Sequence, residues 1–199
     1  MYKRQGDARA STPKIHYPDL VEELLPREER IHWILDKSAR LIEGGAVPVS
    51  GLVLPTGKHF PDRYDGSAEA LQRLLMRVAK HAGLSDLELT ANLVVPEGEA
   101  AGGGCSSGAC GVPASSQKQV RRVEEQGDGY KVNIIANELG NPIILMTALV
   151  RAIGHVFLQE ADLARTFDRK DYDHGIDLTG TMLGFGTILG NGAYVYRKG

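Results

Sequence analysis

Residues 141–160 read Asn-Pro-Ile-Ile-Leu-Met-Thr-Ala-Leu-Val-Arg-Ala-Ile-Gly-His-Val-Phe-Leu-Gln-Glu, a nearly continuous apolar run. Asn141 suits the N-cap of a helix, and Pro142 suits the first helical turn, where its missing N–H is no loss. Four polar side chains recur at intervals of four residues: Thr147, Arg151, His155 and Gln159. That spacing puts them on one side of a helix. The sequence therefore predicts a buried helix whose single polar stripe faces a cleft or solvent. We favour the cleft because the other faces are so apolar.

The composition is that of an ordinary globular chain, with 42% hydrophobic and 24% charged residues over a length of 199, which suffices for a real core. We expect a mobile tail over residues 1–17 and a single domain over 18–199. A net charge of -2 gives no reason to expect nucleic acid. No apolar run reaches the roughly 18 residues needed to span a membrane, and the N-terminus lacks the apolar segment of a signal peptide. Two cysteines without a secretion signal favour a cytoplasmic location.

Hydrophobic periodicity and turn residues predict the remaining elements. Ser67 is an expected N-cap, and the turn Gln126-Gly-Asp-Gly129 indicates a hairpin. The expected elements are a helix within 18–43, a β-rich run over 47–54, a helix from 67 to 83, a strand over 87–95, strands over 119–125 and 130–136, the apolar helix, and a Gly-rich closing helix that begins at Asp173, its N-cap. This order predicts an α+β fold, with a small, mostly antiparallel sheet and helices packed on one side. Gly180 and Gly184 would let the closing helix lie tightly against the apolar helix.

Residues 97–116 form a Gly/Ser-rich segment that contains Cys105 and Cys110. A zinc site needs about four ligands, and no second Cys or His pair lies nearby. A phosphate-binding loop would need a Gly-Lys-Ser/Thr sequence and a following helix, and neither is present. We interpret the segment as a surface loop, with a metal or redox role as the alternative.

The sequence Leu149-Val-Arg-Ala-Ile-Gly-His-Val-Phe-Leu158 resembles the active-site helix of zincin metallopeptidases, which reads His-Glu-x-x-His in an apolar frame. The resemblance implies that His155 matches the second zinc-binding histidine. It puts Arg151 in the place of the first histidine and Ala152 in the place of the general-base Glu. Asp177, in the following helix, is placed like a third ligand.

A wider resemblance covers most of the chain after residue 31. The segments Leu54-Pro-Thr-Gly-Lys-His-Phe-Pro-Asp-Arg-Tyr-Asp-Gly-Ser67 and Ile176-Asp-Leu, together with Leu183-Gly-Phe-Gly186 and the apolar helix, are similar to a family of uncharacterised bacterial proteins. Members of that family carry an intact His-Glu-x-x-His.

Two departures from the zincin pattern decide the expected function. Arginine stays protonated and offers no lone pair to zinc, and alanine cannot accept a proton from water. We therefore expect a catalytically silent zincin-like domain, a pseudo-metallopeptidase without a catalytic residue or a cofactor. With no metal, a buried Asp177 would lack a neutralising charge, so we predict that Arg151 pairs with Asp177 or Asp173. The residues expected at this cleft are Arg151, His155, Gln159, Asp173 and Asp177.

Three function classes stay open. The favoured one is a non-enzymatic binding, regulatory or structural domain with an unidentified protein partner. The second is a metal-dependent hydrolase, with zinc as the possible metal, that uses His155, His174 and Asp177 as ligands and Glu160 or Glu138 as the base. The third is a protein that assembles through its Gly-rich C-terminal helix. A lone histidine on an apolar helix is, without the resemblance, most often a core or boundary residue.

Overall fold

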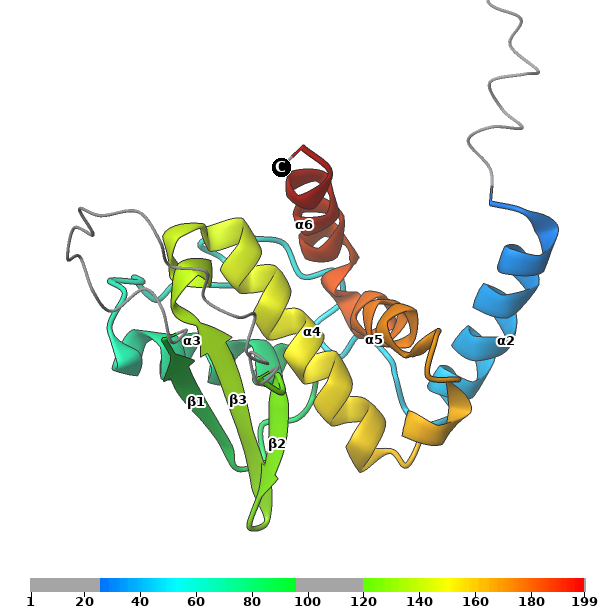
Figure 1. The fold of residues 1–199 in the computed structure, drawn as a ribbon, viewed down its shortest axis with the longest axis horizontal. Coiled ribbons are helices and arrows are strands. Elements are labelled where there is room, and N and C mark those ends of the chain that lie inside the picture. The colour runs from blue at the N-terminus through cyan, green and yellow to red at the C-terminus, as the bar shows by residue number, and fades with distance from the viewer. Residues whose placement is uncertain (1–25, 96–119, 199) are drawn as a thin grey trace, which may run out of the picture. The chain divides into compact units, whose positions relative to one another are not determined.

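The computed structural model describes residues 26–95 and 120–198 (Figure 1). The predicted tail over 1–17 and the Gly/Ser-rich segment over 97–116, with Cys105 and Cys110, lie outside the described residues. By its internal contacts the chain divides into two units, Met1–Leu35 and Asp36–Gly199. The site and the fold that positions it belong to the second unit, and the single domain expected over 18–199 stays a prediction.

The chain is α+β, as the sequence predicts. Its elements are α2 (Glu28–Glu43), α3 (Ala68–His81), β1 (Leu89–Val94), β2 (Val123–Gln126), β3 (Gly129–Ile135), the 3-10 helix η1 (Ala136–Gly140), α4 (Pro142–Glu160), the 3-10 helix η2 (Ala164–Thr166), α5 (Tyr172–Gly180), the π-helical turn η3 (Thr181–Phe185) and α6 (Gly186–Lys198). Two predicted helix starts are confirmed. The Asn141 side chain accepts hydrogen bonds from the N–H groups of Ile143 and Ile144, and Ser67 Oγ accepts one from Ala70 N.

The sheet has the strand order β1-β3-β2 (Figure 1). Strands β2 and β3 form the predicted antiparallel hairpin, with Val123 opposite Val132. Strand β1 pairs with β3 in parallel, with Leu89 opposite Tyr130, so the sheet is mixed. The hairpin turn predicts the pairing of β2 with β3 only. The alternating pattern of β1 predicts which of its faces is buried, but not whether it runs parallel or antiparallel to β3.

The outer edge of β1 is covered by a side chain from α3. Gln72 Nε2 donates to the carbonyl oxygen of Leu89, and Gln72 Oε1 accepts from the N–H of Ala91, each at 2.7 Å. The amide of Gln72 therefore takes up a donor and an acceptor that a further strand would otherwise pair.

Helices α3 and α4 contact each other and the strands, so they cover one face of the sheet. Val132 and Ile134 of β3 point to this covered face and are fully buried. The prediction that no apolar run is long enough to cross a membrane is wrong, because α4 could cross one by length and composition. However, 61% of its apolar window is buried inside the protein. The burial is that of a core helix, as expected from its apolar faces.

Helix α4 meets α5 at a glycine contact. A Cβ atom at Gly154 would lie 2.9 Å from the carbonyl oxygen of Ile176, and one at Gly180 would lie 3.1 Å from Val150 Cγ1. The close approach predicted for Gly180 is thus confirmed. Gly154 contributes equally, because its missing side chain lets the backbone of α5 come this near.

The chain differs from prediction at the second glycine. The expected closing helix is two helices, α5 and α6, joined through η3, where Gly184 has φ 99°. The predicted strand over 47–54 is wrong: these residues form turns and an irregular loop, in which Val53 N donates to Gly184 O at 2.9 Å. A Cβ atom at Gly184 would meet the carbonyl oxygen of Gly51. Gly184 therefore leaves room for this loop and not, as predicted, for α4. The β propensity of residues 47–54 is a local property and does not show their contact with Gly184.

Candidate functional site: the Arg151 bridge between α4 and α5

Arg151 lies in the middle of α4 and reaches two carboxylates on α5. Its Nε atom lies 2.8 Å from Asp177 Oδ1, and its Nη2 atom donates to Asp173 Oδ1 at 3.0 Å. The two aspartates are four residues apart in a helix, so they share one face. The predicted contact between Arg151 and Asp177 or Asp173 is therefore present, with both carboxylates.

Asp173 is not the N-cap that the sequence predicts. Helix α5 begins at Tyr172, and the capping position belongs to Asp171, whose side chain makes no capping hydrogen bond. Asp173 is already inside the first turn, and its carboxylate binds Arg151 instead. An acidic residue in this turn also interacts favourably with the helix dipole.

The charges at this contact are only partly balanced. Burial raises the pKa of Asp177, and the Arg151 guanidinium opposes that shift without cancelling it. Arg151 Nε is buried and meets the distance of an ion pair with Asp177, but it makes no well-aligned hydrogen bond. Asp173 is 84% exposed, so water screens its attraction to the arginine. One guanidinium thus serves two carboxylates, and neither contact is a bidentate pair.

His155 follows Arg151 by one helical turn and is enclosed by two polar neighbours. Its ring meets the ring of Tyr172 edge-on, with 5.5 Å between the centroids and an interplanar angle of 82°. Gln159 Nε2 lies 3.3 Å from His155 Nε2. Burial lowers the pKa of His155, so the imidazole is neutral at pH 7 and its Nε2 can accept from this amide.

Tyr172 belongs to the site, although no motif in the sequence indicates it. Its hydroxyl group is buried and makes no well-aligned hydrogen bond with a described residue, and the Gln159 side chain lies close to it. Burial raises the pKa of Tyr172, so the hydroxyl stays protonated. Tyr172 directly precedes Asp173 in a charged segment, and no periodicity of the sequence marks it as a neighbour of His155.

The polar stripe of α4 is divided between two neighbouring helices. Thr147 is buried and donates to the carbonyl oxygen of Ile143, and a Cβ atom at Gly192 of α6 would meet its side chain. Arg151 and His155 face α5 through the contacts above. The stripe therefore contacts α5 and α6, and the Arg151 side chain within it is partly exposed to solvent.

The residues present do not fit a zinc ion. Within 26–95 and 120–198, no group of three or more His, Cys, Asp or Glu side chains is arranged to hold a metal. His155, His174 and Asp177 are thus not assembled into a ligand set, and His174 is exposed. Arg151 occupies the carboxylates that a metal would need.

The two glutamates considered as a base are engaged elsewhere. Glu138 forms a bidentate pair with Arg122, with both N–O distances at 2.6 Å. Glu160 Oε1 accepts a hydrogen bond from the Tyr130 hydroxyl at 2.6 Å. Ala152, in the position that the zincin resemblance gives to the base, is fully buried. Neither Glu138 nor Glu160 is therefore free to act as a base beside His155.

No protein-family model, curated protein or solved structure matches the chain. The class that the fold itself defines is a small α+β protein with a helix-covered mixed sheet. Any closer assignment rests on the residues of α4 and α5.

Proposed function

We propose that this protein is a non-catalytic zincin-like domain, a pseudo-metallopeptidase in which the Arg151 bridge stands where the metal would be. The single observation that carries the proposal is the contact of Arg151 with both Asp173 and Asp177 at 3.0 and 2.8 Å. Arginine appears in the place of the first metal ligand, and its positive charge meets the carboxylate in the place of the third. A bound cation and a fixed guanidinium meet the same electrostatic need.

The chemistry of the bridge supports a binding role rather than hydrolysis. Hydrolysis by this type of site needs an activated water and a proton acceptor. Arg151 can supply neither, and Ala152 carries no acceptor. The protein partner and the cytoplasmic location expected from the sequence belong to the same proposal.

Restoring one ligand tests the proposal. In Arg151→His, histidines at 151 and 155 would lie one turn apart on α4, facing the freed Asp177. We expect the purified variant to bind a stoichiometric amount of zinc in a metal titration followed by calorimetry. The wild-type protein should bind none under the same conditions.

Two control variants make the result specific. Arg151→Met removes the guanidinium without adding a ligand, and Arg151→His combined with His155→Ala leaves a single new histidine. Neither should bind zinc. A folded Arg151→His variant without zinc affinity would refute the zincin-like arrangement. Stoichiometric zinc in the wild-type protein that disappears in His155→Ala would instead establish the metal-dependent alternative.

Among the described residues, no contact favours the third function class, assembly through the Gly-rich C-terminal helix. Gly180 and Gly184 face Val150 and the loop at Gly51, so both small residues are used within the chain. On α6, Gly190 is exposed, and a Cβ atom there would meet nothing within 4 Å.

A further inference from the structure

A serine and a histidine from separate segments form a hydrogen-bonded pair at the C-terminal end of α3. Ser50 lies in the turn between Pro48 and Gly51, and its Oγ atom lies 3.0 Å from Nδ1 of His81, the last residue of α3. Ser50 is exposed, whereas His81 is half-buried. The pair shares no residue with the Arg151 bridge, so it lies outside the function proposed above.

The backbone carbonyl group of His59 determines which nitrogen of His81 carries the proton. His81 Nε2 lies 3.0 Å from the carbonyl oxygen of His59, and this oxygen can only accept, so Nε2 is the donor. In the neutral ring Nδ1 then has the free lone pair, and the Ser50 hydroxyl donates to it. Ser50, His81 and the carbonyl group therefore stand as a nucleophile, its base and the group that orients the base.

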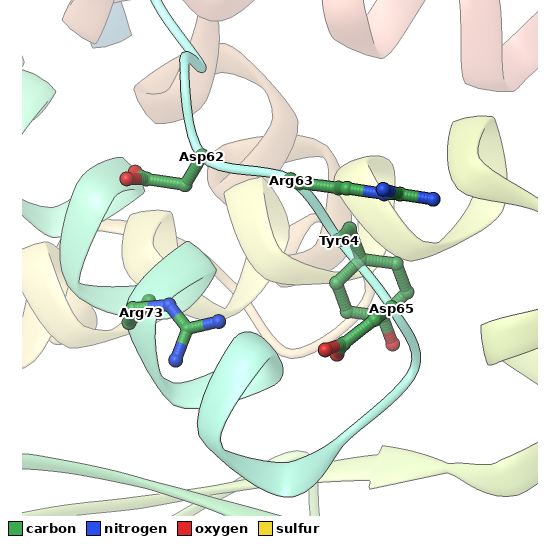
Figure 2. A pocket seen from close by; sticks show the side chains of 5 residues that line it. All are labelled: Asp62, Arg63, Tyr64, Asp65 and Arg73. Carbon is green, nitrogen blue, oxygen red and sulfur yellow. The ribbon is translucent and has the colours of Figure 1, made fainter.

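The base is held in place by its surroundings. The rings of His59 and Phe60 meet the His81 ring edge-on, with 5.6 and 5.5 Å between the centroids. Asp62, which lines the pocket in Figure 2, accepts two hydrogen bonds from Arg77, one turn before His81 on α3. The segment that carries the His59 carbonyl group is thus tied to the helix that carries the imidazole. Such fixed orientation is what a side-chain base needs.

Exposed aliphatic side chains and free amide groups flank Ser50 in the chain. Val47, Val49 and Leu52 are 48%, 65% and 61% exposed. Val49 lies over the end of α3, because a Cβ atom at Gly83 would lie 3.0 Å from its Cγ2 atom. Among the described residues, the N–H groups of Ser50 and Leu52 take part in no hydrogen bond. An acyl chain can cover the aliphatic groups, and the N–H groups can donate to a carbonyl oxygen that gains negative charge.

We propose that Ser50 and His81 form a site that hydrolyses esters of aliphatic carboxylic acids. Ser50 Oγ bonds to the acyl carbon while its proton passes to His81 Nδ1. The C–O bond to the leaving alcohol breaks, and the alcohol takes that proton. Water then attacks the acyl-serine ester, and its proton passes through Nδ1 to Oγ, so that the carboxylic acid is released and Ser50 is restored. The His59 carbonyl group positions the base and does not touch the substrate.

A covalent probe tests the nucleophile in the full chain. We expect one equivalent of an alkyl fluorophosphonate, which reacts with activated serines, to attach to Ser50, as located by mass spectrometry of the peptides. Ser85 is the internal control, because it is also exposed and forms no hydrogen bond with a side chain of the described residues. It should stay unlabelled, and Ser85→Ala should react like wild type. An unlabelled Ser50, or equal labelling of both serines, would overturn the proposal.

His81→Gln tests the base. Glutamine can still donate to the His59 carbonyl oxygen, but it cannot take up the Ser50 proton. We expect the rates of labelling and of p-nitrophenyl butyrate hydrolysis to fall about 100-fold. In the wild-type protein both rates should also fall on acidification, because a protonated ring accepts no proton, and this readout does not require the variant to fold. A lower melting temperature of His81→Gln with an unchanged labelling rate, or labelling independent of pH, would overturn the assignment.

A comparison of two esters tests the substrate class. We expect the KM for p-nitrophenyl butyrate to be several-fold lower than that for p-nitrophenyl acetate, because the longer chain covers more of the aliphatic surface beside Ser50. Leu52→Ser should reduce this difference. Equal KM values for the two esters in the wild-type protein would show that the aliphatic side chains take no part and would overturn the assigned class of substrate.

Discussion

Two arginine–carboxylate contacts of this protein are built very differently. Arg122 holds Glu138 with two parallel bonds of 2.6 Å, and Glu138 is only 8% exposed and also accepts from Ile135 N. Arg151 instead makes one contact to each of two partly exposed carboxylates. The first pair is geometrically complete and belongs to the core. In the second, two carboxylates share one guanidinium, and not all of its N–H groups are used. We therefore expect the fold to depend on it much less.

The largest effect should follow from breaking the complete pair. Glu138→Ala would remove the carboxylate from the half-buried Arg122 fork, which would keep only its hydrogen bond to the Asn133 carbonyl oxygen. We expect the free energy of unfolding to fall by about 3 kcal/mol, as when one member of a buried ion pair is removed. Urea denaturation measures this free energy. Asp173→Ala, which removes an exposed contact, should lower the free energy of unfolding by less than about 1 kcal/mol. Equal losses in both variants would contradict the distinction between the two contacts.

A second variant separates packing from charge at the seam between α4 and α5. Gly154→Ala would push a methyl group against the Ile176 carbonyl oxygen, and the backbone must shift to admit it. We expect a loss of about 1–3 kcal/mol. Gly190→Ala, where the space is open, should gain up to about 1 kcal/mol in the same denaturation experiment. If Gly154→Ala were harmless and Arg151→Met severe, the bridge rather than the packing would hold α5 in place.

His155 should give the Arg151 site a pH dependence. Burial lowers the pKa of His155 below its ordinary value of 6.5, so the unfolded chain binds a proton more readily than the folded one. The stability due to the neutral ring is present above pH 6.5 and is lost as the pH falls below it. His155→Asn should therefore flatten the fall in melting temperature on the acid side of pH 6.5. An unchanged profile would place the ring in water.

The smallest effect is expected at Asp177. Its pKa is raised above 3.8 by burial, so its carboxylate is held less favourably in the folded state, and stability falls as the pH rises through the raised pKa. Asp177→Asn removes this dependence together with one ion pair. We expect the free energy of unfolding at neutral pH to change by less than about 1 kcal/mol in either direction. A loss as large as that of Glu138→Ala would make the two arginine contacts equivalent.

Local signals predicted the elements that depend on local chemistry. The cap at Asn141, the cap at Ser67 and the turn at residues 127–128 each specify a conformation within a few residues, and all three are present. The parallel pairing of β1 and the loop over 47–54 depend on distant partners. Val53 has a high β propensity, so its sequence would also suit a strand. The hydrogen bond from Val53 N to Gly184 O shows why these residues form a loop instead.

The Arg151 bridge was predictable because it combines helical spacing with opposite charges. Its neighbour Tyr172 was not, because the ring reaches His155 only after η2 turns the chain back toward α4.

The amide of Gln72 sets the width of the sheet. By occupying the backbone groups of Leu89 and Ala91, it acts as a short artificial neighbour that ends the hydrogen-bonded ladder. The remaining strand edge is too brief to recruit another molecule along its whole length. A single residue on a helix thereby stands in for a neighbouring strand at this edge of the sheet, a form of cover that needs neither charge nor proline on the strand itself.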